Sequence, residues 1–105
     1  MKIRKDRYYR VRGATTQLYW ISCTKCKEKI CIYQKDGKGN LFRLYADRLI
    51  VLLNGIKLKD EKGNTKKNLV CSCMNVLAVL MYYKRESRMA YRLIKGRIIK
   101  SKYYG

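Results

Sequence analysis

Residues 17–35 have the sequence QLYWISCTKCKEKICIYQK, and this stretch decides the fold. The aromatic and β-branched run 17–22 predicts a strand that leads directly into Cys23. The polar segment 23–29 predicts a tight turn, and the run 30–35 predicts the returning strand. The turn of this predicted hairpin therefore carries a pair of cysteines, Cys23 and Cys26.

A second cysteine pair, Cys71 and Cys73, lies far along the chain, directly after Leu69-Val70. Two close thiol pairs from distant segments are typical of one tetrahedral zinc site. The chain has no histidine, so four thiolates would complete the coordination shell and leave no position for water. We therefore predict a structural zinc ion bound by Cys23, Cys26, Cys71 and Cys73.

The cysteines also have other interpretations. Cys31 could replace Cys71 or Cys73 as a ligand, although a small buried strand residue is the simpler reading. All of the cysteines could instead be reduced core thiols. A disulfide between Cys71 and Cys73 would be strained at that spacing. A redox pair at Cys23 and Cys26 would have lysines to lower a thiol pKa, but the usual strand-then-helix setting is missing.

The remaining segments extend the β pattern. Residues 7–12 predict an edge strand, and 41–54 fit a helical stripe or a buried strand. We expect a strand for 41–54, because Asn54-Gly55 suits a hairpin. The final predicted hairpin joins 76–83 to 88–100, with Gly96 as a bulge. The fold class is thus mainly β, a small antiparallel sheet domain over residues 1–105 with one four-cysteine zinc site and a charged excursion at about 56–68.

The cysteine arrangement resembles a zinc ribbon, in which two cysteine turns lie on β-hairpins. The long gap between the pairs also resembles the β-tent scaffold of Yippee-type domains and of the methionine sulfoxide reductase B family. The resemblance covers the cysteine spacing and the β-rich pattern of residues 17–100. It implies a scaffold and a zinc ion, but no reductase activity, because the active-site histidines of that family have no counterpart here.

Charge is the second strong signal. Lys and Arg number 26 against 7 Asp and Glu, which gives a net charge of +19 over 105 residues. Such a field favours a polyanion, meaning nucleic acid, anionic lipid or an acidic protein surface. The apolar run 76–83 is too short to span a membrane. No apolar secretory core follows the basic start of the chain, so we expect a cytoplasmic protein.

Basic residues gather towards both ends of the chain, with tyrosines between them. We expect adjacent strands to join these runs into one positive face that contacts phosphates, while tyrosines stack on unpaired bases. For any single tyrosine, filling a strand position is the simpler explanation. The predicted nucleic-acid-binding residues are Arg7, Tyr8, Arg10, Arg12, Arg88, Arg92, Arg97, Lys100 and Tyr104.

These observations favour a non-enzymatic zinc-binding protein that binds nucleic acid, with RNA or a ribonucleoprotein preferred to DNA. No catalytic constellation stands out, since histidine is absent and the glycine-rich segment 36–40 lacks the pattern of a phosphate loop. One alternative is a ribbon-like interaction module that docks on an acidic partner, using the excursion. A thiol redox protein is the third.

Overall fold

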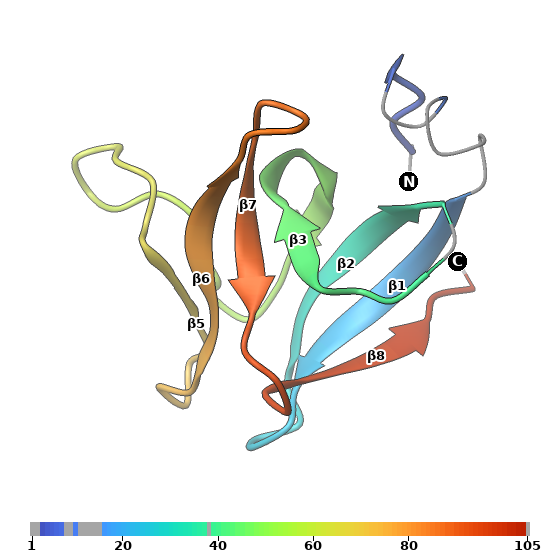
Figure 1. Ribbon diagram of the computed structural model, residues 1–105. Coiled ribbons are helices and arrows are strands. Elements are labelled where there is room, and N and C mark those ends of the chain that lie inside the picture. Colours follow the sequence, from blue (N-terminus) through green and yellow to red (C-terminus); the bar gives the residue numbers. More distant parts are fainter. Residues whose placement is uncertain (1–2, 8–9, 11–15, 38, 105) are drawn as a thin grey trace.

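The computed structural model describes residues 3–7, 10, 16–37 and 39–104. These residues form two four-stranded antiparallel sheets, which are seen side by side in Figure 1. The elements in chain order are β1 (Thr16–Cys23), β2 (Lys29–Asp36), β3 (Arg43–Tyr45), the 3-10 helix η1 (Ala46–Arg48), β4 (Leu49–Leu52), β5 (Asn68–Val70), β6 (Val76–Tyr83), β7 (Arg88–Leu93) and β8 (Ile98–Lys102). The predicted fold class, mainly β with antiparallel sheets and clustered cysteines, is confirmed.

Sheet A has the strand order β4-β2-β1-β8, and its centre is the predicted hairpin of β1 and β2. Sheet B has the order β3-β7-β6-β5, and the predicted hairpin of β6 and β7 forms its centre. Each cysteine pair therefore belongs to a different sheet: Cys23 ends β1, and Cys71 follows β5. Strand pairing thus places the two thiol pairs on different sheets. The two sheets must pack together if one ion is to bind all four sulfurs.

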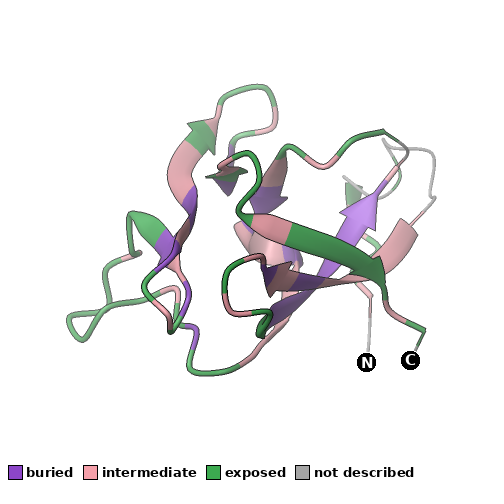
Figure 2. Cartoon of the chain, turned by 90° about the horizontal axis from the view of Figure 1, so that it is seen from below, coloured by how far each residue is buried: buried purple, intermediate pink, exposed green. Residues whose placement is uncertain are grey.

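The core lies between the sheets, as the burial colouring in Figure 2 shows. Ile21 and Tyr33 face inwards from sheet A, and Leu44, Leu77 and Tyr91 face inwards from sheet B, each with at most 1% of its surface exposed. The hydroxyl of Tyr33, in the middle of β2, accepts a 2.8 Å hydrogen bond from the Tyr45 N–H. The central strand β2 is buried along its length from Ile30 to Asp36, whereas β7 has exposed residues, Met89 and Arg92, between its buried ones.

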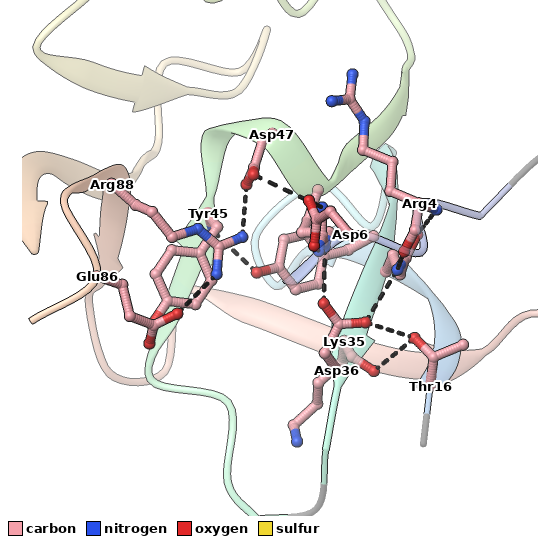
Figure 3. A network of polar contacts seen from close by, with 12 residues as sticks. Arg4, Asp6, Thr16, Lys35, Asp36, Tyr45, Asp47, Glu86 and Arg88 are labelled. Carbon is pink, nitrogen blue, oxygen red and sulfur yellow. Dashed lines mark hydrogen bonds and ion pairs between the residues drawn. The ribbon is translucent and has the colours of Figure 1, made fainter. Parts of the chain in front are cut away.

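Two buried arginines, Arg48 and Arg88, lie at the end of the fold opposite the cysteines. Figure 3 shows Arg88 with its partners Asp47 and Glu86. Arg48 is 1% exposed and pairs with Asp6 at 2.6 Å, Asp36 at 2.7 Å and Asp47 at 3.6 Å. Arg88 pairs with Asp47 at 2.6 Å and Glu86 at 3.0 Å. We call Arg48, Arg88, Asp6, Asp36, Asp47 and Glu86 the carboxylate network. The guanidinium groups of Arg48 and Arg88 are tolerated in the interior because carboxylates pair with them.

Three local predictions need correction. Of the predicted edge strand 7–12, Tyr8, Tyr9 and 11–12 lie outside the described residues, whereas Arg7 and Arg10 lie in a helical turn. Asn54-Gly55 does form a left-handed turn, with φ of 52° and 77°, but the described residues after it add no strand to β4. The segment 88–100 is divided by a turn at 94–97, so Gly96 is a turn residue, with φ of 79°, and not a bulge.

The part of the chain after β4 is the charged excursion. Within it Lys59 and Thr65 form an isolated antiparallel bridge. Asp60 accepts hydrogen bonds from the N–H groups of Lys62 and Asn64, each at 2.9 Å, which closes the turn. Ile56 anchors the excursion in the core at 7% exposure. The described residues contain no helix that is long and apolar enough to cross a membrane.

Candidate metal centre

The four predicted zinc ligands come together from the two sheets. The Sγ atoms of Cys23 and Cys73 lie 3.7 Å apart, and those of Cys26 and Cys71 lie 3.3 Å apart. All four sulfur atoms lie within 4.8 Å of one another. We call Cys23, Cys26, Cys71 and Cys73 the cysteine cluster.

These distances suit a single tetrahedral ion. A zinc–sulfur bond of about 2.3 Å places neighbouring sulfurs about 3.8 Å apart in a regular tetrahedron. The separations of 3.7 Å and 3.3 Å lie a little below this value, and no two of the four sulfurs are more than 4.8 Å apart. They are much longer than a disulfide bond of about 2.05 Å, and all five cysteines are free thiols. The cluster is therefore positioned to hold a metal ion that prefers sulfur ligands.

Each cysteine turn ends in a residue with left-handed backbone. Lys27, directly after Cys26, has φ of 66°, and Met74, directly after Cys73, has φ of 72°. The Lys27 N–H donates to the Cys23 carbonyl at 2.9 Å, and the Met74 N–H donates to the Cys71 carbonyl at 2.8 Å. Glycine would adopt this conformation more easily. The two turns thus share a conformation at the residue after their second cysteine, although their spacings differ.

Two polar residues, Asn75 and Arg97, support the cluster. Sequence analysis did not identify either of them in this role. The Asn75 amide donates to the Cys23 sulfur at 3.3 Å. Its carbonyl oxygen in turn accepts from Arg97 at 2.7 Å. A buried amide that binds both a ligand sulfur and a guanidinium fixes the orientation of that ligand. Because Arg97 follows Cys23 by more than seventy residues, no local sequence signal joins them.

Further hydrogen bonds join the turns around the cluster. The Thr24 hydroxyl donates to the Gly96 carbonyl at 2.9 Å, and the Thr24 N–H donates to the Arg97 carbonyl at 3.2 Å. The Ser72 hydroxyl donates to the Glu28 carboxylate at 3.1 Å. The cluster is therefore tied to the turn between β7 and β8 as well as to both cysteine turns.

The thiols differ in acidity. Burial would raise the pKa of Cys23, but hydrogen bonds from Asn75 and from backbone N–H groups outweigh it and lower the pKa to about 6. At Cys26 the hydrogen bond from the Glu28 N–H acts to lower the pKa, yet the neighbouring Cys71 thiol and burial raise it to about 12. One member of the first pair thus favours the thiolate form that a metal requires.

Cys31 is not part of the cluster. It is fully buried in β2, where it pairs with Ile21 of β1. Burial raises the pKa of its thiol to about 12. This position suits the simpler reading of Cys31 as a small apolar core residue.

The predicted nucleic-acid-binding residues lie on several elements. Arg92 lies on β7 of sheet B, whereas Lys100 lies on β8 of sheet A, because β8 pairs with β1 and not with β7. Both side chains are exposed, as are those of Arg7, Arg10, Arg97 and Tyr104. Tyr8 and Arg12 lie outside the described residues. Arg92 and Lys100 are therefore not on adjacent strands, and the role of these residues in nucleic-acid binding stays a prediction.

Arg88 is a further correction. Its side chain is 5% exposed, and its guanidinium lies 3.7 Å from the centre of the Tyr45 ring. The two carboxylates that it binds, Asp47 and Glu86, come from η1 and from the turn before β7. Arg88 therefore holds the sheets together at the carboxylate network and does not belong to the exposed basic surface.

Lysines beside the first cysteine pair would partly offset the negative charge of a metal–thiolate centre. Lys25 and Lys27 are exposed next to it. The Lys29 ammonium instead lies 4.1 Å from the centre of the Trp20 ring, a cation–π contact on β1.

No protein-family model matches this chain, and the searches of curated proteins and of solved structures gave no significant match.

Proposed function

We propose that this chain is a non-enzymatic, zinc-stabilised domain that binds nucleic acid, with RNA preferred to DNA. The observation that carries the proposal is the distribution of charge. Four of the acidic residues, Asp6, Asp36, Asp47 and Glu86, are paired with the buried Arg48 and Arg88. Four carboxylates against two guanidinium groups leave the carboxylate network a net charge of −2, and Asp36 is the buried one of the four acids. These acids are therefore placed around two internal cations and not among the exposed lysines and arginines.

The described surface is left strongly positive. Every lysine and arginine of the described residues is exposed apart from Lys35, Arg43, Arg48 and Arg88. The exposed acids of the described residues are Glu28, Asp60 and Glu61, and these lie on one cysteine turn and on the excursion. A field of this kind attracts phosphates at long range and gives binding that depends steeply on salt.

Zinc is the ion that four cysteine thiolates in a tetrahedral arrangement suit best. The ligand shell would be closed, which supports a structural ion and not a catalytic one. A cysteine pair from each of two antiparallel sheets also supports the resemblance to zinc ribbons and to the β-tent scaffold. The metal would supply cross-linking between the sheets, and the chain would supply the charged surface.

RNA is preferred to DNA because of the exposed aromatic and basic side chains of the described residues. A sheet surface with exposed aromatic and basic side chains suits unpaired bases, whereas reading duplex DNA in the major groove usually requires a helix or a β-ribbon of matching shape. Tyr82 and Tyr104 are 53% and 89% exposed. Aromatic rings that face solvent are the groups on which single-stranded bases stack.

The test is a salt titration of zinc-loaded protein with labelled single-stranded RNA, duplex RNA and duplex DNA. We expect the tightest binding to single-stranded RNA and a residual affinity near physiological salt. Arg92→Ala combined with Lys95→Ala should weaken binding and lower the slope of log K against log salt by about 0.7 for each lost phosphate contact.

The matched control is Lys57→Ala combined with Lys62→Ala, which removes the same charge from the excursion. It should change binding much less than the Arg92 and Lys95 pair. Equal weak binding to all three nucleic acids that vanishes at modest salt would refute the proposal, because the charge would then act only as a general attraction.

A further inference from the structure

An open groove lies at the margin between the two sheets. Leu41 and Phe42, which precede β3, form one side. Residues 93–96 and Ile98 form the other, with Leu93, Ile94 and Ile98 contributing apolar surface. The groove encloses about 440 Å³. That size is within the range of about 300–1,000 Å³ that is usual for small-molecule sites.

Phe42 is the unusual residue of this groove. It is the one phenylalanine of the chain, and 64% of its surface is exposed. Its backbone is fixed, because the Phe42 carbonyl accepts a 3.0 Å hydrogen bond from the Leu93 N–H. Phenylalanine is normally buried in folded proteins. A ring held at the groove by a fixed backbone and left open to solvent offers an aromatic face to a ligand.

The groove is bordered by positive charge. Lys95 lines it directly. Next along β7 is the exposed Arg92, which pairs with Arg43 of β3. The Arg43 guanidinium is directed elsewhere, 4.2 Å from the centre of the Tyr83 ring and donating to the Tyr45 hydroxyl at 3.3 Å. Like charges at directly opposed strand positions destabilise a sheet. No carboxylate of the described residues forms an ion pair with Arg43, Arg92 or Lys95.

We propose that this groove binds one unpaired base of a single-stranded nucleic acid, with the base against Phe42 and the flanking phosphates near Lys95 and Arg92. A nucleotide combines a flat apolar ring with an anionic phosphate, which is the combination that the groove complements. A purely apolar ligand would leave the charges of Lys95 and Arg92 unmatched. The inference rests on the proposed function and assigns its base-contacting site.

The far wall of the groove is connected to the cysteine cluster. Thr24, directly after Cys23, binds the carbonyl groups of Gly96 and Arg97. The Ile94 N–H also donates to the Leu77 carbonyl at 3.0 Å. Residues 94–97 are thus held between the first cysteine turn and β6. Such fixation lowers the entropic cost of ordering the site when a ligand binds.

The experiment compares two labelled probes by fluorescence anisotropy: a ten-nucleotide polyuridine RNA and an abasic chain with the same number of phosphates. We expect wild-type protein to prefer the polyuridine. Phe42→Ala should weaken polyuridine binding by about 5- to 150-fold and leave binding of the abasic chain unchanged. Phe42→Trp should keep the affinity, and the fluorescence of the added indole should be quenched on binding.

Met89→Ala is the matched control, because Met89 is an exposed apolar residue of β7 outside the groove, and we expect it to leave polyuridine binding nearly unchanged. Circular dichroism checks that each variant is folded. Loss of polyuridine binding in Phe42→Ala alone supports the groove. Tight binding that Phe42→Ala leaves unchanged would overturn the groove but keep the proposed function.

Wild-type protein that binds neither probe would overturn both proposals. An acidic peptide with an aromatic residue provides the last comparison. Phe42-dependent binding of that peptide, without Phe42-dependent binding of polyuridine, would make the groove a protein-docking site and refute its assignment to a base.

Discussion

Loss of the metal is the perturbation that should affect this fold most. The substitution Cys71→Ser removes one ligand from the cysteine cluster, at a site that is 2% exposed. Structural zinc contributes on the order of 10 kcal/mol to the folding of small domains. The whole stability of a domain is usually about 5–15 kcal/mol. Release of the ion should therefore unfold the domain, or separate its sheets.

The hydrogen bonds near the cluster cannot replace the ion. Those between the cysteine turns and their neighbours involve Thr24, Ser72 and Asn75. Each contributes about 1 kcal/mol, and less where water competes. Their sum is thus a few kcal/mol at most. The carboxylate network lies at the other end of β2 and cannot hold the cysteine turns in place.

The assay is urea unfolding of zinc-loaded protein, followed by Trp20 fluorescence and by circular dichroism, with and without a chelator. Cys31→Ala is the matched control, because Cys31 is fully buried but outside the cluster. We expect it to cost about 0.5–1.5 kcal/mol, the range for loss of one buried heavy atom. Equal midpoints for Cys71→Ser and Cys31→Ala, or no response to the chelator, would refute the reasoning.

Three further results follow from the contacts. Arg88→Ala should destabilise the fold by about 3 kcal/mol, the low end of the range for a broken buried ion pair, since it removes a buried side chain whose partners Asp47 and Glu86 are half-buried, whereas the exposed Arg92→Ala should cost less than about 0.5 kcal/mol in the same thermal unfolding experiment. Asn75→Ala should lower zinc affinity by about 10- to 100-fold in a chelator competition, and an unchanged affinity would show that its bond to Cys23 does not orient the ligand. Met74→Gly should raise the free energy of unfolding by about 0.5–1 kcal/mol, because glycine tolerates φ of 72°. The urea midpoint should rise accordingly, and a lowered midpoint would contradict this.

Local patterns were enough to predict the cysteine cluster and the two central hairpins. The strand at 76–83 agrees with β6 to the residue, because its apolar run and the turn signal after it are local features. The cysteine pairs were recognised because metal ligands of this kind lie close together in sequence. Each of these signals can be recognised without knowing which strands pair with one another in the sheets.

Sheet membership and burial of charge could not be predicted in the same way. β7 and β8 follow one another in sequence, yet they belong to different sheets, because the turn at 94–97 redirects the chain towards β1. The sequence pattern predicts Arg88 to be an exposed strand residue. In the structure it is buried beside Asp47, which comes from a distant segment of the chain. The Asn75–Arg97 bond likewise depends on this long-range pairing. Such contacts are set by the folded chain as a whole and leave no periodic trace in sequence.

The positions of the acids connect stability with function. Among the described residues, each acid except Glu61 has a hydrogen-bonding or ionic partner within the fold: four bind the buried arginines, Glu28 binds Ser72, and Asp60 closes its own turn. The acids therefore serve the structure, and the exposed lysines and arginines remain unbalanced. An unbalanced field destabilises the compact state by self-repulsion. The cysteine cluster at one end of the sheets and the carboxylate network at the other offset that repulsion. A bound polyanion would relieve the repulsion directly, which is why we expect binding and stability to rise together.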